Sequence, residues 1–393
     1  MAGISTISPL IFSFILLSLS ALSLSKSLPY QTFIPQSLPS LHPLTWDQQS
    51  DALTHIAADE LTVAGEETEN TLSLQLHHLD YLNLDQANAS SDALFINRLT
   101  RDAGRVEALA SVAAVKTNST RTRHRGKSVS YGDGSFTVGE FSTETMTFRR
   151  NRVKNIALGC GHDNEGLFVG AAGLLGLGRG RLSFPSQAGP RFGRAFSYCL
   201  VDRSASSKPS SIIFGSSAVS RKAVFTPLIS NPKLDTFYYI GLTGISVGGA
   251  PVRGVSASLF KIDAAGNGGV IIDSGTSVTR MTRPAYIAMR NAFRVGARNL
   301  KRAPAFSLFD TCFDLSGVSE VKVPTVLFHF KGANVGLPAS NYLIPVDSKG
   351  TFCFAFAGTS NGLSIIGNIQ QQGFRVVYDL GRSRVGFARD GCA

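Results

Sequence analysis

Residues 270–277 read Val-Ile-Ile-Asp-Ser-Gly-Thr-Ser, an apolar run that ends in Asp273 and a glycine turn flanked by hydroxyl groups. Apolar residues directly before a turn indicate a short buried strand, so Asp273 is predicted to lie at the end of that strand. Gly275 permits a tight turn, and the hydroxyls of Ser274 and Thr276 can hydrogen-bond the carboxylate and fix its direction. Plain β-turns share this composition, so the stretch alone leaves a purely structural role open.

The chemistry that such a turn suggests requires a second acid. When two aspartates share one proton, the like charges raise one pKa, so that one group can donate a proton while the other acts as a base. A water held between them can then attack a peptide bond. No second Asp-Thr-Gly or Asp-Ser-Gly occurs anywhere in the 393 residues.

The region from Ser128 onward is predicted to be mostly β, because short apolar and β-branched runs alternate with glycine-rich turns. One helix is predicted over Arg283–Val295, which opens at Pro284 and carries Tyr286, Met289 and Phe293 at helical spacing. A second is predicted over Leu94–Val115. The predicted strands are Phe136–Val138, Lys154–Leu158, Ser211–Phe214, Phe237–Ile240, Gly269–Ile272, Thr325–Phe330 and Phe374–Tyr378.

The start of the chain indicates export. Residues 9–25 are apolar and uncharged and end in small residues, as in a secretory signal peptide, which we place at residues 1–25. No later stretch has the apolar length of a membrane span. The mature protein is therefore expected to be secreted to the extracellular space, with Asn88 and Asn118 in glycosylation sequons.

Charge is unevenly distributed. Residues 1–100 hold two basic and ten acidic residues, a net charge of −8, which leaves +19 for residues 101–393. We expect an acidic leader and a basic body to attract each other, and a basic secreted body to favour polyanions such as acidic cell-wall polysaccharide. Nucleic acid is the competing partner for a basic protein, but the chain has no nucleic-acid-binding motif.

The five cysteines of an exported chain imply disulfides, with one cysteine unpaired. No pair has Cys-x-x-Cys spacing. Cys160 and His162 come closest to a metal-ligand pair, and two ligands make no zinc site. No metal or organic cofactor is expected.

Several further motifs occur in one order along the chain, and together they resemble a plant nepenthesin-type member of the pepsin-like aspartic peptidases from about Val129 to Cys392. Arg98–Asp102, followed by Arg105 and Val106, is similar to the end of the propeptide in that group. The motifs are Ser130-Tyr131-Gly132-Asp133-Gly134-Ser135, Gly159-Cys160-Gly161-His162, Ala172-Gly173-Leu174-Leu175-Gly176-Leu177-Gly178, Phe196-Ser197-Tyr198-Cys199-Leu200, Ile365-Ile366-Gly367-Asn368 and Gly373–Asp379.

The resemblance implies a bilobal, mostly β pepsin-like fold and a monomeric endopeptidase that cleaves peptide or protein substrates at acid pH. It gives Asp273 the catalytic role, with Ser274, Gly275 and Thr276 orienting it. Tyr131 and Gly132 of the flap, together with Ser277, would contact the substrate. The domains that follow are a propeptide-like leader (26–115), a basic linker (116–127), a partial N-terminal lobe with the flap (128–230) and a C-terminal lobe (231–393).

One departure from the family pattern changes the expected function. Family members carry a first Asp-Thr-Gly-Ser loop between propeptide and flap, where this chain has only the linker, so the N-terminal lobe is expected to be incomplete. By resemblance Cys312 pairs with Cys353 and Cys199 with Cys392, which leaves Cys160 without its partner. We expect an impaired peptidase. The alternatives are a non-catalytic inhibitor of cell-wall glycosidases and, less favoured, a dimer in which each chain supplies Asp273.

A serine esterase is a further alternative, because Gly244-Ile245-Ser246-Val247-Gly248 fits the Gly-x-Ser-x-Gly pattern. That motif needs a strand–turn–helix context. The residues after Gly248 are poor helix starters, so the pentapeptide is better explained by a β-hairpin. The glycine-rich Gly176–Gly180 lacks the spacing of a phosphate-binding loop and is interpreted as a turn.

Overall fold

The computed structural model describes residues 29–38, 70–77, 90–114, 127–130, 135–148, 151–166, 173–202, 209–389 and 392. Several predictions fall outside these ranges. They are the signal peptide at residues 1–25, the sequons at Asn88 and Asn118, the flap residues Tyr131 and Gly132, and all of the basic linker except its last residue.

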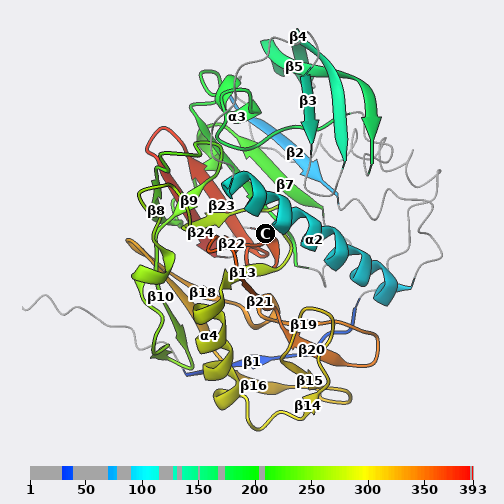
Figure 1. Cartoon of the computed structure of the whole chain (residues 1–393), viewed down its shortest axis with the longest axis vertical. Coiled ribbons are helices and arrows are strands. Elements are labelled where there is room, and N and C mark those ends of the chain that lie inside the picture. Colours follow the sequence, from blue (N-terminus) through cyan, green and yellow to red (C-terminus); the bar gives the residue numbers. More distant parts are fainter. Residues whose placement is uncertain are drawn as a thin grey trace, which may run out of the picture.

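The described chain is mostly β, as predicted, and one 11-stranded sheet runs through its centre (Figure 1). Strand β12 (Val270–Ile272) is buried on both faces and pairs in parallel with β22 (Ser364–Ile366), which explains its uninterrupted apolar sequence. The other strands of this sheet are β2 (Leu72–Leu76), β7 (Ser210–Phe214), β6 (Ala195–Cys199), β23 (Phe374–Asp379), β24 (Arg384–Arg389), β8 (Val224–Ile229), β9 (Tyr239–Ile240), β13 (Thr279–Thr282) and β21 (Phe356–Thr359).

The described residues also form four smaller sheets. A three-stranded sheet contains the long hairpin of β4 (Phe136–Phe148) and β5 (Asn151–Glu165) with β3 (Lys127–Ser130). A two-stranded sheet joins β1 (Tyr30–Phe33) to β16 (Val321–Pro324). The two four-stranded sheets comprise β11 (Ala250–Pro251), β10 (Leu242–Val247), β17 (Val326–Phe330) and β18 (Ala333–Leu337), and β14 (Arg302–Ala303), β15 (Cys312–Asp314), β20 (Thr351–Phe354) and β19 (Leu343–Pro345).

Both predicted helices are confirmed. Helix α4 (Arg283–Gly296) buries Tyr286, Met289 and Phe293, and Phe293 stacks on Phe354 at a centroid distance of 4.3 Å. Helix α2 (Ser91–Ala114) begins three residues before its predicted start. Its predicted apolar face is buried at Phe95 and Leu99 but not at Val112, which is exposed although its neighbour Ala113 packs against the body. A short helix α3 (Phe184–Gln187) follows the glycine-rich Gly176–Gly180.

Three parts of the leader (residues 26–115) pack on the body of the protein. Strand β1 pairs with β16, strand β2 pairs with β7 at the edge of the central sheet, and α2 lies across that sheet (Figure 1). Phe95 and Leu99 of α2 pack in one apolar cluster with residues of the body such as Val278, Ile344 and Ile369. The leader therefore forms part of the folded protein over these residues.

Two disulfides connect distant parts of the chain. Cys312 and Cys353 are register partners on β15 and β20, and Cys199 at the end of β6 is bonded to Cys392. These are the two pairs that the resemblance implies. Cys160 on β5 is free and exposed.

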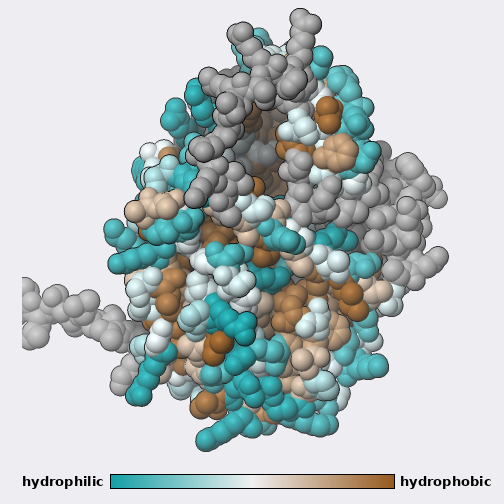
Figure 2. All heavy atoms as spheres, viewed as in Figure 1, coloured by the Kyte–Doolittle hydropathy of each residue, from teal (hydrophilic) through white to brown (hydrophobic). Residues whose placement is uncertain are grey.

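Large apolar side chains are exposed at several places in the described part of the chain, and one group of them lies in and after the β3–β5 sheet. Figure 2 shows hydrophobic residues at the surface in the upper part of the molecule, where that sheet lies. Exposed examples are Val129, Phe141, Leu174, Leu175 and Leu182. No helix within the described ranges is long and apolar enough to cross a bilayer.

Candidate active site

Two chain segments hold the turn that carries Asp273. Because β12 and β22 are parallel neighbours, the loops that follow them leave the sheet at the same edge, and the Asp273 amide donates to the carbonyl of Ile366 (3.1 Å). The Asn368 side chain donates to the carbonyl of Ser274 (3.0 Å), and the Asn368 amide donates to the carbonyl of Thr276 (2.7 Å). These bonds fix the turn against the second loop, so the direction of the Asp273 side chain is fixed as well.

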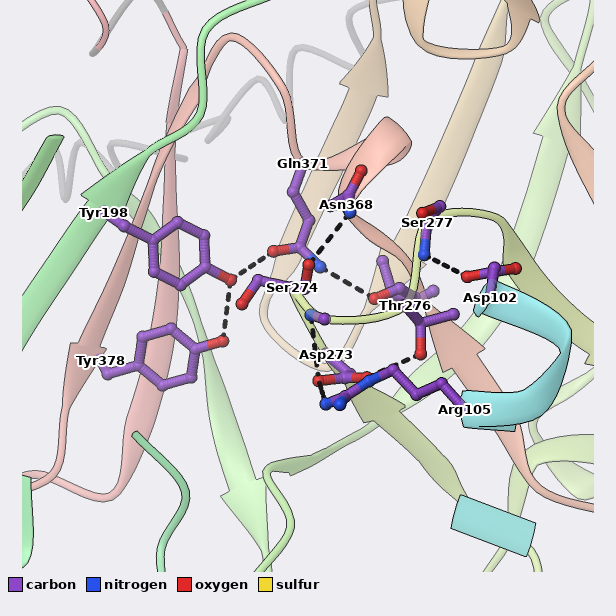
Figure 3. A network of polar contacts seen from close by, with 12 residues as sticks. Asp102, Arg105, Tyr198, Asp273, Ser274, Thr276, Ser277, Asn368, Gln371 and Tyr378 are labelled. Carbon is purple, nitrogen blue, oxygen red and sulfur yellow. Dashed lines mark hydrogen bonds and ion pairs between the residues drawn. The ribbon is translucent and has the colours of Figure 1, made fainter. Parts of the chain in front are cut away.

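Two groups of the turn itself bond the carboxylate. The hydroxyl of Thr276 donates to Oδ2 of Asp273 (2.6 Å), and the amide of Gly275 donates to Oδ1 (3.2 Å). Thr276 is fully buried, so its hydroxyl is held in place. The Ser274 hydroxyl lies toward Tyr198 (Figure 3). The carboxylate is therefore oriented by Thr276 and Gly275, and Ser274 contributes through its backbone carbonyl.

The leader helix places an arginine directly on this carboxylate. Nε of Arg105 donates to Oδ2 of Asp273 and Nη2 donates to Oδ1, each at 2.8 Å (Figure 3). This two-point pairing of a planar guanidinium with a carboxylate is among the stronger charged contacts in proteins. The Asp273 side chain keeps 17% of its exposure and that of Arg105 keeps 41%, so solvent screens the pair in part.

Gly275 makes this approach possible. A Cβ atom at that position would lie 2.4 Å from Cζ of Arg105, and neighbouring guanidinium nitrogens would be almost as close. Any side chain there would push the arginine off the carboxylate. The backbone of Gly275 does not have a positive φ, so the glycine serves the close contact with Arg105 of α2 rather than the conformation of the turn.

A second ion pair lies one helical turn away, and in this pair the helix supplies the acid instead of the base. Asp102 accepts a hydrogen bond from Nη2 of Arg280 (2.8 Å) through Oδ2, and its Oδ1 accepts from the amide of Ser277. Both partners are buried. Because the carboxylate comes from α2 and the guanidinium from β13, the pair attaches the helix to the strand that follows the Asp273 turn.

Two tyrosines face the turn from the opposite side. The hydroxyl of Tyr198 on β6 lies 3.1 Å from that of Tyr378 on β23, and it donates to Oε1 of Gln371 (Figure 3). The Gln371 amide in turn donates to the carbonyl of Ile366 (2.9 Å). Burial raises the pKa of both phenols, so both stay neutral hydrogen-bonding groups beside Asp273.

The pKa values of Asp273 and of Asp102 on α2 are shifted in opposite directions from the ordinary value. Burial raises the pKa of Asp273, but the hydrogen bonds and charge of Arg105, together with the bonds from Thr276 and Gly275, outweigh it, and the pKa lies below its ordinary value of 3.8. Burial dominates at Asp102 and holds its pKa above 3.8 despite the charge of Arg280. Asp273 is therefore an anion above pH 4, bound to a cation.

The structure brings part of the predicted site together and adds residues to it. Ser277 lies in the turn, and its amide is bonded to Asp102. Arg105, Asp102 and Arg280 were not predicted as site residues. The Arg98–Val106 motif was the signal for the first two, because it was identified as an element of the leader, but its contacts cannot be derived from the motif alone.

The serine-esterase interpretation lacks its structural context. Ser246 is buried within β10, and no helix follows the Gly244–Gly248 pentapeptide. The Ser246 hydroxyl lies 2.7 Å from Nε2 of His329, whose Nδ1 lies 2.7 Å from Oδ1 of Asn334, so the three side chains form a hydrogen-bonded chain. They lie on three paired strands rather than at a sharp strand–helix turn, so the pattern belongs to the sheet.

No metal site forms within the described part of the chain. Nowhere in it do three or more His, Cys, Asp or Glu side chains gather as they would around an ion. Cys160 and His162, the closest approach in the sequence, both lie exposed on β5.

The geometry defines a class of protein. An aspartate at the end of a buried strand, in an Asp-Ser-Gly-Thr turn supported by a parallel neighbour strand on a mostly β fold, has the arrangement expected for one of the two acids of an aspartic peptidase. Two solved structures share the fold. One, titled "Crystal structure of edgp", has a TM-score of 0.55 at 24% identity and covers 67% of this chain and 70% of its own. A conglutin gamma, a basic 7S globulin from lupine seeds, has a TM-score of 0.51 at 22% identity and covers 72% and 79%.

Sequence comparisons identify the family. The families described as "Xylanase inhibitor N-terminal" and "Xylanase inhibitor C-terminal" match residues 100–216 and 237–389. "Aspartyl protease family protein 2" of Arabidopsis thaliana is 80% identical over 265 residues, 67% of this chain and 55% of that protein. "Aspartic proteinase nepenthesin-1" of Nepenthes gracilis is 43% identical over 268 residues, 67% of this chain and 60% of that protein. The chain therefore belongs to the bilobal pepsin-like aspartic peptidases, in their plant nepenthesin-type group, and spans little more than half the length of these relatives.

The buried Asp102–Arg280 pair gives a first prediction. Asp102→Ala leaves the Arg280 charge buried without its partner and is expected to cost about 3–5 kcal/mol of unfolding free energy. Asp102→Leu combined with Arg280→Met should cost much less than the sum of the two single changes. Urea denaturation measures all of these variants. Asp92→Ala is the matched control, because Asp92 bonds the exposed Ser348 from the first turn of the same helix. The prediction would be contradicted if the double variant lost as much unfolding free energy as the two single variants together.

The lowered pKa of Asp273 gives a second prediction. Its contribution to the docking of α2 is fully present above the ordinary pKa of 3.8 and is lost as the pH falls through the lower pKa of the folded state. Amide protection factors in α2 should therefore exceed those of Asp273→Asn at pH 5, and the difference should disappear well below pH 3.8. Asp102 affects the pH dependence of α2 docking in the opposite direction, but it does so both in the parent chain and in Asp273→Asn. The difference between the two proteins therefore reports on Asp273. A difference that stays constant with pH would contradict the prediction.

Proposed function

We propose that this chain is an aspartic endopeptidase family member in which hydrolysis of peptide bonds at acid pH is impaired. The observation that carries the proposal is the environment of the Asp273 carboxylate. Every hydrogen bond described there comes from an N–H or O–H donor, and none comes from a second carboxyl group. Asp102, the neighbouring acid, is occupied by Arg280 and Ser277.

A single acid cannot perform the family reaction efficiently. The attacking water needs one carboxylate as base, and the departing amine needs a proton from the other, so the pair acts as a unit. Loss of one member of such a unit removes most of the rate enhancement rather than half of it. Asp273 remains the catalytic residue of this proposal, oriented by Thr276 and Gly275. Ser274 would help to orient the acid, and Tyr131, Gly132 and Ser277 would contact the substrate.

An incomplete N-terminal lobe at residues 128–230 explains the missing acid. The apolar side chains exposed in and after the β3–β5 sheet support this proposal, because lost strands would have covered them. The free Cys160 also supports it, since its partner would lie in the missing piece. Residues 231–393 would form the C-terminal lobe with Asp273.

The leader would block the site until it is removed. Residues 26–115 are proposed to act as a propeptide, since α2 places Arg105 where a substrate carbonyl would have to approach Asp273. The basic linker 116–127 would then lie between leader and body.

The setting proposed for the protein is extracellular. A signal peptide at residues 1–25, the two disulfides and the sequons at Asn88 and Asn118 support secretion to the apoplast. The excess of basic residues after position 100 favours acidic wall polysaccharide as a surface partner of a monomer.

A cleavage assay tests the main proposal. Purified chain from which the leader has been cleaved should hydrolyse an unfolded protein substrate at pH 3–4 at least roughly a thousandfold more slowly than the mature form of a relative with both acids, because half of the unit is absent. In the uncut chain, Arg105→Ala should not restore cleavage, since freeing Asp273 supplies no second acid. Robust acid-pH cleavage that Asp273→Ala abolishes would overturn the proposal.

A non-catalytic inhibitor is the second candidate. It is favoured by the two family matches, whose descriptions name xylanase inhibitors. The purified chain should then bind a microbial xylanase and lower its activity, and Asp273→Ala should leave this inhibition unchanged. Xylanase activity that is unaffected by a large excess of chain would remove this candidate.

A further inference from the structure

The first leader strand occupies a position far from Asp273 along the chain and in the fold. Strand β1 pairs antiparallel with β16, from Tyr30 opposite Pro324 to Phe33 opposite Val321. Strand β1 is the only described strand that pairs with β16. The ladder continues one residue beyond the strand, where the Thr325 amide donates to the carbonyl of Pro29 (3.1 Å).

Gln31 is held by a specific pair of acceptors. Its Nε2 donates to the carbonyl of Leu337 (3.1 Å) and to the hydroxyl of Tyr342 (2.6 Å). The Tyr342 hydroxyl donates in turn to the carbonyl of Pro324 on β16 (2.7 Å), and the tyrosine is fully buried. A side-chain amide fits these acceptors, whereas an apolar side chain would leave them without a donor.

Phe33 fills an apolar pocket of the body. Its side chain is only 6% exposed and belongs to the main hydrophobic core. Its ring meets that of Phe352 edge to face, at 5.7 Å and 81°, a favourable aromatic geometry. An isolated six-residue leader segment has no core of its own, so this burial is available only on the body.

Side chains alternate along β1 as they do when a peptide is added to a sheet edge. Tyr30 and Thr32 are exposed, whereas Gln31 is half-buried and Phe33 buried. In such recognition the main-chain bonds supply affinity, and pockets for alternate side chains supply specificity. The sequence pattern selected here is Gln-x-Phe.

We propose that the edge of β16, with the acceptors on Leu337 and Tyr342 and the pocket at Phe352, is a binding site for an extended Gln-x-Phe peptide. Its occupant is residues 29–34 of this chain, and the site retains them after the leader is cut downstream. The site uses residues 321–352 and not Asp273, so the inference does not depend on whether the chain hydrolyses peptides.

A cut-and-retain experiment tests the proposal. A recognition sequence for a specific protease is inserted between residues 41 and 69 of the full chain, and the folded protein is then cleaved. The N-terminal fragment should co-elute with the body on sizing chromatography, as mass spectrometry would show. An excess of synthetic peptide 29–38 should displace it. Immediate separation of the fragment at micromolar concentration would overturn the proposal.

Peptide variants then identify the determinants. After displacement, binding of labelled peptide 29–38 to the cleaved protein is measured by fluorescence anisotropy. Phe33→Ala should raise Kd by about a hundredfold or more, since a buried aromatic ring is lost. Gln31→Ala should raise it by about tenfold. Ile34→Ala is the matched control, because Ile34 is 62% exposed, and its Kd should equal that of the parent. Equal Kd values for the Phe33 and Ile34 variants would overturn the assigned pockets.

Discussion

A carboxylate taken largely out of water must be paired, and the arrangement around the active-site turn follows from that constraint. Asp273 lies at the end of a buried strand and receives the bidentate Arg105. Three residues earlier on the same helix, Asp102 offers the reverse charge to Arg280. Because the two pairs have opposite polarity, sliding α2 by one turn along the body would bring like charges together. The pairs thus fix the helix in one register across the centre of the molecule.

Much of the fold could be predicted from local pattern. The apolar run before Asp273 predicts a buried strand, and β12 is that strand. Pro284 and the helical spacing that follows predict α4 to within one residue. The hydroxyl–glycine turn predicts an oriented carboxylate, and Thr276 and the Gly275 amide orient it. These features depend on residues that are neighbours in sequence, where spacing determines geometry.

The contacts of the leader could not be predicted, because they join residues far apart in the chain, such as Arg105 and Asp273, which are 168 positions apart. The helical pattern over Leu94–Val115 indicates an apolar face but does not say which surface it covers, and Val112 proves to be exposed. The net charges of leader and body suggest that acidic residues of the leader contact basic residues of the body. Asp102 and Arg280 follow this expectation. At Asp273 the polarity is reversed, since the leader supplies the base. The net charge of a segment of a hundred residues does not determine which partner supplies the acid in a single ion pair.

The strand order of the central sheet governs how this protein can be made. Strands β6 and β7 lie on one side of the β23–β24 hairpin and β8 lies on the other, although about 145 residues separate β8 from β23 in the chain. A growing polypeptide therefore leaves the ribosome with β6, β7 and β8 complete but without the strands that belong between them. Such high contact order slows folding and leaves strand edges open in the meantime. The chain is therefore most exposed to aggregation while the central positions of this sheet are still empty.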